Sequence, residues 1–306
     1  MMKSRNILTF ILFCAAFSAI FLLSSTPVCS ESPGHSKGKI KVVVSILPQA
    51  YFVERVGGER VDVSVLVGPG YSPATYEPRP RQMAELGKAK VYFRIGVPFE
   101  NVWMMRISRA NPHMRVIDTR HGIELRSMRT YHPDKAKQHH PYPKGMKDPH
   151  IWLSLRLVKV QAQNICHALT SEDPAHKTYF EGNLRAFHHD LDRLDAETRG
   201  VLKNLKTRKF MAFHPAWGYF AGDYGLEQIP VEIEGKEPSA RALAGLIKRA
   251  KQEGIKVVFV QAQFSTKNAE TVARAIGGRI VQIDPLAKDY LKNMKKIAET
   301  FRKVIQ

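Results

Sequence analysis

Residues 173–205 read DPAHKTYFEGNLRAFHHDLDRLDAETRGVLKNL and predict one long helix. Asp173 suits the N-cap, and Pro174 suits the first helical position, where its missing N–H is not needed. Apolar side chains then recur at spacings of three, four or seven residues, at Phe180, Leu184, Phe187, Leu191, Leu194, Val201 and Leu205. An uninterrupted helix of about 30 residues would be about 45 Å long. Such a rod can connect two lobes and resist hinge motion between them.

Predicted strands alternate with predicted helices on both sides of this segment. The expected strands, one of them (61–67) from its alternating pattern, are 42–46, 61–67, 91–95, 116–117, 210–213, 229–233, 257–260 and 280–283. The helices expected between them are 48–56, 79–87, 99–109, 240–252, 267–276 and 286–304. This alternation predicts an α/β fold with two lobes, each with a mostly parallel sheet flanked by helices, bridged by one long rigid helix. We expect the first lobe to span 31–172, the linking helix 173–205 and the second lobe 206–306.

Composition is that of an ordinary globular protein. The chain has 306 residues, 44% of them hydrophobic and 25% charged, which argues against a mainly disordered, collagen-like or polytopic membrane protein. Its three cysteines are too few for a disulfide scaffold or a cysteine-rich zinc module. The core must therefore come from apolar packing.

The N-terminus predicts export from the cytoplasm. Lys3 and Arg5 precede an apolar run, 7–23, which gives way to small residues that end at Ser30. These features are typical of a secretory signal peptide over residues 1–30. An uncleaved anchor and lipid attachment at Cys29 are the alternatives. We expect a periplasmic or otherwise extracytoplasmic protein, with membrane anchoring left open.

The chain is strongly basic, with a formal net charge of +19 that cleavage after Ser30 would lower to +17 by removing Lys3 and Arg5. The basic residues are spread along the whole chain rather than gathered in an arginine-aromatic cluster, so we expect no nucleic-acid partner. Attraction to an anionic membrane surface and a simple solvated surface both remain compatible with this charge.

Three side chains are candidate metal ligands. His214 follows the predicted strand 210–213 and Asp284 follows the predicted strand 280–283, at the sheet edge where open parallel sheets bind ligands. His150 ends a polar loop just before apolar structure resumes. Two imidazoles and a carboxylate suit a cation such as zinc, manganese or iron. Taken singly, each residue could instead be a helix or turn cap, or a satisfied core histidine.

Four motifs together resemble one protein family. They are SPATYEP at 72–78, DPHIW at 148–152, FHPAW at 213–217 and IDPL at 283–286. In this order, and over roughly residues 40–305, the chain resembles the zinc/manganese substrate-binding proteins of ABC importers, the cluster A-I group of periplasmic binding proteins. The resemblance implies two (β/α)4-like lobes bridged by a rigid helix, and it matches His150, His214 and Asp284 to metal-ligating positions.

The same resemblance implies the function. A metal ion, Zn2+ with Mn2+ or Fe2+ as alternatives, would be held in the cleft between the lobes and delivered to an ABC permease in the membrane. We expect a monomeric binding protein that is not an enzyme. A metal-dependent hydrolase is the alternative, with an activated water at an open coordination position. It would need a nearby general base, and no glutamate adjoins the three candidate ligands in the sequence.

The chain departs from the family pattern in the first lobe. Family members place a first ligand histidine in the turn where this chain has Tyr71, Ala74 and Glu77, and no histidine lies between His35 and His113. Water could complete the metal shell, Glu77 or a loop histidine could substitute, or the metal could bind weakly. A site with three protein ligands and an open position would be looser than a closed four-coordinate one.

A histidine-containing loop precedes the second motif. The segment 126–149 holds His132, His139 and His140, with six basic and two acidic residues. The loop is either an arm that gathers metal for the cleft or a solvated loop with incidental histidines. Its positive charge would attract cations poorly.

Overall fold

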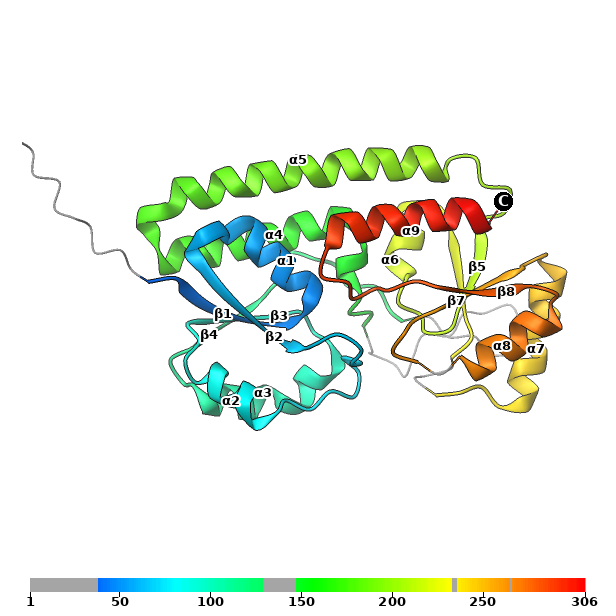
Figure 1. The fold of residues 1–306 in the computed structure, drawn as a ribbon, viewed down its shortest axis with the longest axis horizontal. Helices are drawn as coiled ribbons and strands as arrows, with labels where there is room; N and C mark the ends of the chain where they lie inside the picture. The colour runs from blue at the N-terminus through cyan, green and yellow to red at the C-terminus, as the bar shows by residue number, and fades with distance from the viewer. Residues whose placement is uncertain (1–37, 129–146, 233–235, 265, 306) are drawn as a thin grey trace, which may run out of the picture. The chain divides into compact units, whose positions relative to one another are not determined.

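The computed structural model describes residues 38–128, 147–232, 236–264 and 266–305. Within these residues the chain forms two four-stranded, wholly parallel sheets flanked by helices (Figure 1). The first sheet has the order β2-β1-β3-β4 and contains β1 (Ile40–Ile46), β2 (Val61–Val67), β3 (Val91–Arg94) and β4 (Arg115–Asp118). The second has the order β6-β5-β7-β8 and contains β5 (Lys209–Ala212), β6 (Glu227–Pro230), β7 (Val257–Val260) and β8 (Arg279–Gln282). The predicted fold class is confirmed.

Most of the helices match the predicted ranges. The described helices are α1 (Leu47–Gly57), α2 (Pro80–Leu86), α3 (Pro98–Ala110), α4 (Leu155–Glu172), α5 (Lys177–Leu202), α6 (Gly218–Asp223), α7 (Ala240–Gln252), α8 (Lys267–Ala275) and α9 (Tyr290–Val304). Helices α4 and α6 were not predicted from the sequence. The last helix was predicted to begin at Leu286, but the Leu286 N–H donates to Asp284 Oδ1 in a turn, so α9 starts at Tyr290.

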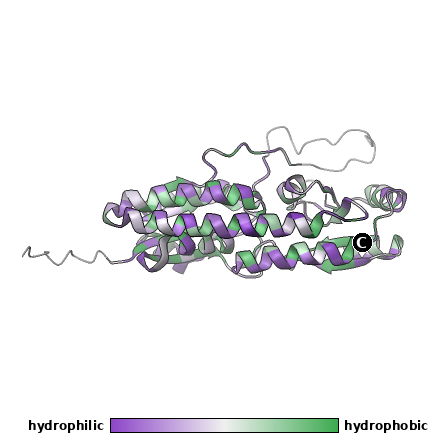
Figure 2. Ribbon diagram, turned by 90° about the horizontal axis from the view of Figure 1, so that it is seen from above, coloured by the Kyte–Doolittle hydropathy of each residue, from purple (hydrophilic) through white to green (hydrophobic). Residues whose placement is uncertain are grey.

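The long helix is present, although its first turn differs from the prediction. Pro174–His176 forms a 3-10 turn, and α5 then runs for 26 residues. This helix packs on α1, which follows β1, and on α4, which comes after β4 in the sequence. It also packs on α9, the last helix of the chain. Figure 2 shows the alternation of polar and apolar residues along the helices. The lobe boundaries at 31–172 and 206–306 stay predictions.

Two of the predicted segments fall largely outside the described residues. Residues 1–37, which include the predicted signal peptide, are not described, and neither are His132, His139 and His140 of the predicted histidine-containing loop. The described ends of that loop meet in an antiparallel bridge between Ser127 and Lys147. Among the helices that are described, none has the length and apolarity that crossing a membrane requires.

Alternate residues of the second sheet face opposite helical layers. Phe210 of β5 and Phe259 of β7 lie 4.9 and 4.3 Å from the ring of Phe301 in α9. Met211 and Val258, their neighbours along the strands, belong instead to a separate core cluster with residues of α7 and α8. Successive side chains along a strand point to opposite faces of the sheet. The faces of these four residues therefore indicate the faces of the residues that follow them at the strand ends.

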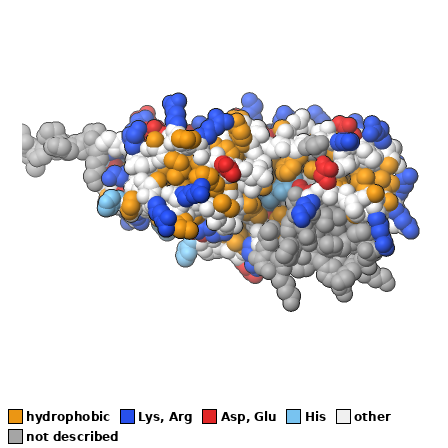
Figure 3. Space-filling view, turned by 90° about the horizontal axis from the view of Figure 1, so that it is seen from below, with side chains coloured by type: hydrophobic (Ala, Val, Ile, Leu, Met, Phe, Trp, Pro, Cys, Tyr) orange, Lys and Arg blue, Asp and Glu red, His pale blue; other side chains and the backbone are white. Residues whose placement is uncertain are grey.

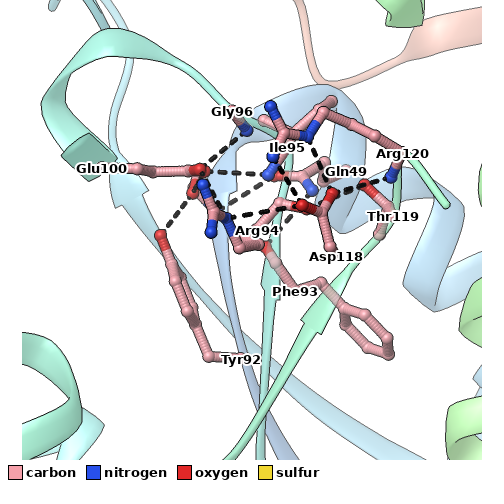
Figure 4. A network of polar contacts seen from close by, with 11 residues as sticks. Gln49, Tyr92, Phe93, Arg94, Ile95, Gly96, Glu100, Asp118, Thr119 and Arg120 are labelled. Atoms are coloured by element: carbon pink, nitrogen blue, oxygen red, sulfur yellow. Dashed lines mark hydrogen bonds and ion pairs between the residues drawn. The ribbon is translucent and has the colours of Figure 1, made fainter. Parts of the chain in front are cut away.

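A buried carboxylate closes the turn between β3 and α3 in the first lobe (Figure 4). Glu100 accepts hydrogen bonds from the backbone N–H groups of Ile95 at 2.9 Å and Gly96 at 2.7 Å, and from Ser45 Oγ at 2.5 Å. Burial raises the pKa of Glu100 above its usual value, although these hydrogen bonds and nearby Arg94 oppose the shift. The side chain thus satisfies two backbone donors that the turn would otherwise leave unpaired.

Glu100→Ala is expected to lower the free energy of unfolding by about 2–4 kcal/mol, since two buried N–H groups would lose their acceptor. Urea unfolding measures this change. Glu85→Ala is the matched control: Glu85 is half-exposed and pairs with Lys88, and such surface pairs contribute about 0–1 kcal/mol. Equal losses in the two variants would contradict a special role for the Glu100 carboxylate.

Candidate metal centre

His214 is fixed by groups from two neighbouring strands. It follows β5, whose pairing with β7 continues through the hydrogen bond from Phe213 N to Phe259 O. Its Nδ1 lies 2.9 Å from Oε2 of Glu232, which comes just after β6. The ring stacks on Phe264, with centroids 4.7 Å apart and planes 18° apart. The imidazole is thereby held in one orientation.

His150 is held in the same manner by a loop carboxylate. Both its backbone N–H and its Nδ1 lie within hydrogen-bond distance of Asp148 Oδ1, at 3.0 and 2.7 Å. The carbonyl of Asp148 accepts a hydrogen bond from the hydroxyl of Tyr219 in α6, at 3.0 Å. Both Asp148 and His150 are buried. This loop is therefore tied to an element that follows α5 in the sequence.

The two imidazoles meet through their outer nitrogens. His150 Nε2 and His214 Nε2 are 3.3 Å apart. An ionised carboxylate can only accept hydrogen bonds, so Asp148 and Glu232 place a proton on each Nδ1 and leave a lone pair on each Nε2. Two lone pairs facing each other at this distance repel unless a cation lies between them.

The separation fits a shared metal ion. Two nitrogens bound to zinc at about 2.0–2.1 Å, with a tetrahedral angle of about 109°, would lie about 3.3 Å from each other. Carboxylates behind the Nδ1 atoms are the usual support of metal-ligating histidines, because they fix the tautomer and raise ligand basicity. The residues present therefore fit a divalent transition-metal ion.

The pKa of His150 also favours the metal-binding form. Burial holds it below the usual value of about 6.5, an effect that Asp148 opposes only in part. A neutral imidazole at neutral pH keeps its Nε2 lone pair available for a cation. Burial together with Asp148 also raises the pKa of Tyr219 to about 12, so this tyrosine stays a hydrogen-bond donor.

Asp284, the third predicted ligand, is not brought into a cluster with the histidines. Among the residues that the structure describes, no group of three or more His, Cys, Asp or Glu side chains is placed to hold a metal ion. Asp284 Oδ1 accepts from the Leu286 N–H, and its turn lies near the site, since Trp152 Nε1 donates to the Pro285 carbonyl at 2.8 Å. Its role as a ligand stays a prediction.

The first-lobe turn offers no evident replacement for the missing histidine. The Tyr71 hydroxyl accepts a hydrogen bond from Arg79, and its ring packs against Tyr76, so this side chain is already engaged. Ala74 is exposed and has no donor atom. The substitution of Glu77 for the missing histidine, one of the alternatives from the sequence, stays a prediction.

Neither supporting carboxylate was predicted from the sequence. Asp148 stands two residues before His150, and this short spacing was the available signal. Glu232 is 18 residues from His214 and meets it only because β6 lies beside β5 in the sheet. Figure 3 shows exposed histidine side-chain atoms near the middle of the face opposite α5.

Fold and geometry together define the class: two parallel sheets flanked by helices, one long helix between them in the sequence, and an imidazole from each side of that helix, with the two Nε2 atoms 3.3 Å apart. Residues 42–304 match the model of the family described as zinc-uptake complex component A, periplasmic. The chain belongs to this family, and the resemblance proposed from the four motifs is confirmed.

Individual relatives agree with the family assignment. The chain is 29% identical over 276 residues to the high-affinity zinc uptake system protein ZnuA of Bacillus subtilis, covering 88% of this chain and 86% of that protein. It is 28% identical over 290 residues to the zinc-binding protein AdcA of Streptococcus pyogenes, covering 87% of this chain but only 56% of that longer protein. A solved ZnuA deletion mutant with zinc bound is 43% identical, with a TM-score of 0.81, covering 88% of this chain and 98% of that one.

Proposed function

We propose that this chain is an extracytoplasmic solute-binding protein that captures zinc and delivers it to an ABC permease. The observation that carries the proposal is the pair of Nε2 atoms 3.3 Å apart, each backed by a carboxylate on the opposite ring nitrogen. Family membership supports it, as do the zinc-uptake and zinc-binding names of the relatives.

Capture would need no chemical step. His150 and His214 turn their Nε2 atoms toward each other, and Asp148 and Glu232 would offset the charge of the arriving cation from behind the rings. Asp284 is the proposed third protein ligand. Because imidazole must be deprotonated to bind, affinity should fall on acidification. The part of the fall due to His150 should come below the usual histidine value of about 6.5, since burial lowers its pKa.

The same contacts argue against the hydrolase alternative, which none of the three relatives supports by name. Glu232 and Asp148 are in contact with the imidazoles, and each accepts a hydrogen bond from an Nδ1–H group. Neither is free to take a proton from a water as a general base. We therefore propose a binding protein without catalysis, acting as a monomer beside its permease.

Metal analysis of protein purified without a histidine tag tests this function directly, followed by competition titration with zinc, manganese and iron. We expect one zinc per chain and the tightest binding for zinc, because two imidazoles suit it better than manganese, which prefers oxygen donors. Failure to bind any of the three metals would refute the proposal. Hydrolysis of an ester or amide, lost on chelation, would favour the enzyme instead.

Glu232→Gln is expected to weaken zinc binding about tenfold, which is the lower end of the usual effect for a group that supports a ligating histidine. Glutamine can still accept the Nδ1 proton, but it removes the negative charge that makes the ring a better donor. Competition titration measures the change. Glu237→Gln, an exposed site five residues on, is the control, and equal affinities in the two variants would count against the supporting role.

A further inference from the structure

Gln261 is a buried side chain whose polar atoms make no hydrogen bond with the described residues. It follows β7 directly and is only 2% exposed. Within the described residues, neither its Oε1 nor its Nε2 has a hydrogen-bond partner. Buried amides are nearly always paired, because an unpaired one has lost its hydrogen bonds to water without replacement. The position therefore indicates a missing partner.

A buried glutamine elsewhere in the chain shows the contrast. Gln49 in α1 is also buried, and both ends of its amide are occupied. Its Oε1 accepts from the Ser45 N–H at 3.1 Å, and its Nε2 donates to the Phe93 carbonyl at 3.2 Å. Gln49 thus has a structural role, whereas Gln261 lacks the contacts that such a role requires.

The strand register places Gln261 beside His214. Ala212 of β5 is paired with Pro230 on one side and with Phe259 on the other. Two residues further along, the same register sets His214 between Glu232 and Gln261. The observed hydrogen bond from His214 to Glu232 confirms this continuation on the β6 side.

Side-chain direction leads to the same placement. Phe210 and Phe259 face α9, so His214 and Gln261, four and two residues later, continue on that face. The register sets Ile283 beside Gln261. Asp284 is the next residue, so it does not continue the line formed by Glu232, His214 and Gln261. The turn that starts at Gln261, closed by the bond from Phe264 N to Gln261 O at 3.2 Å, also carries the ring that stacks on His214.

We propose that Gln261 is a positioning residue of the metal site, whose carboxamide hydrogen-bonds a water ligand of the bound ion. The inference rests on the proposed zinc-binding function. The first-lobe turn at 71–77 holds no histidine. Of the replacements open for the fourth coordination position, the proposal takes the water. A carboxamide can both donate to and accept from such a water, and it does so without adding charge to the site.

The decisive variant is Gln261→Leu, because the proposal gives it two effects of opposite sign. Metal-free Gln261→Leu should melt about 2–4 °C higher than the parent protein, since an unpaired buried amide is replaced by an apolar side chain of similar size. Its zinc affinity should nevertheless fall about tenfold. A side chain needed only for folding would lower the melting temperature and the affinity together.

Two further variants sharpen the test. Gln252→Leu makes the same substitution at the C-terminal end of α7, where the side chain is exposed, and should leave zinc affinity within twofold. Gln261→Glu keeps the shape but adds a carboxylate, so its zinc affinity at pH 7.5 should equal or exceed the parent's and decline more steeply on acidification. With Co2+ bound, the visible spectrum of Gln261→Leu should differ from the parent's.

The outcomes separate this inference from the function on which it rests. If the parent protein binds no zinc, the proposed function fails. If the parent binds zinc and Gln261→Leu binds it equally well, only the role of Gln261 is refuted. A fall in the melting temperature of metal-free Gln261→Leu would also refute it, because that result would show a structural role.

Discussion

His214→Ala is expected to weaken zinc binding at least tenfold, and more than any change to the groups behind the ring. The variant removes one of the two Nε2 donors that face each other across 3.3 Å. It also leaves the buried carboxylate of Glu232 without its imidazole partner. Competition titration against a chelator of known affinity measures the loss, which at tenfold corresponds to about 1.4 kcal/mol.

Two control variants show whether the loss belongs to this histidine. His189→Ala removes an exposed imidazole from α5, and His139→Ala removes one from the loop that the structure does not describe. Both should change zinc affinity little. Superimposable titration curves for His214→Ala and the parent protein would discard the site assignment. Melting of the metal-free variant must also be measured, so that a folding defect is not mistaken for lost coordination.

Much of the fold could be predicted because its strands have regular apolar patterns. Residues 61–67 and 257–260 were predicted as strands with the bounds that the structure gives. The first alternates apolar and polar residues, as a half-buried strand does. The second is buried at every position and reads as an unbroken β-branched and aromatic run. The missed helix α4 also carried a signal. Ser154 caps it by accepting from the Leu157 N–H, and Val158, Ala162, Ile165 and Leu169 are buried at helical spacing.

Other elements could not be predicted from periodicity. The six residues of α6 are too few to show a helical repeat. The predicted strand at 229–233 begins two residues earlier, at Glu227, because its start is set by pairing with Lys209 of β5. Such pairing is a tertiary contact, and the sequence of the strand alone does not contain it.

Some residues of the candidate site could be predicted from the sequence, and others could not. The rule that ligands bind beyond the carboxyl ends of parallel strands identified His214 from its place after an apolar run. Glu232 and Gln261 follow the two flanking strands, but they become its neighbours only once the order β6-β5-β7-β8 is known. His150 comes from a loop rather than a strand end, so the family motif, not the strand rule, made it a candidate metal ligand.

Ala74→His is expected to tighten zinc binding about a hundredfold, the second large effect. In family members a histidine from this turn is a metal ligand, and a third imidazole would convert an open site into a closed tetrahedral one. Tyr71, the other candidate position in the turn, is engaged with Arg79, whereas Ala74 is exposed and its side chain makes no polar contact. Thr75→His, at the next exposed residue, is the matched control. Equal affinities for the two variants would show that position 74 does not face the metal.

The same variant also tests the water that Gln261 is proposed to hold. If the new imidazole takes the coordination position of that water, Gln261 loses its partner in the loaded site. Gln261→Leu should then weaken zinc binding about tenfold in the parent protein but hardly at all in the Ala74→His background. The two effects would be non-additive, as expected for groups that share one partner. Independent, additive effects would mean that the carboxamide and the first-lobe turn act at different positions around the ion.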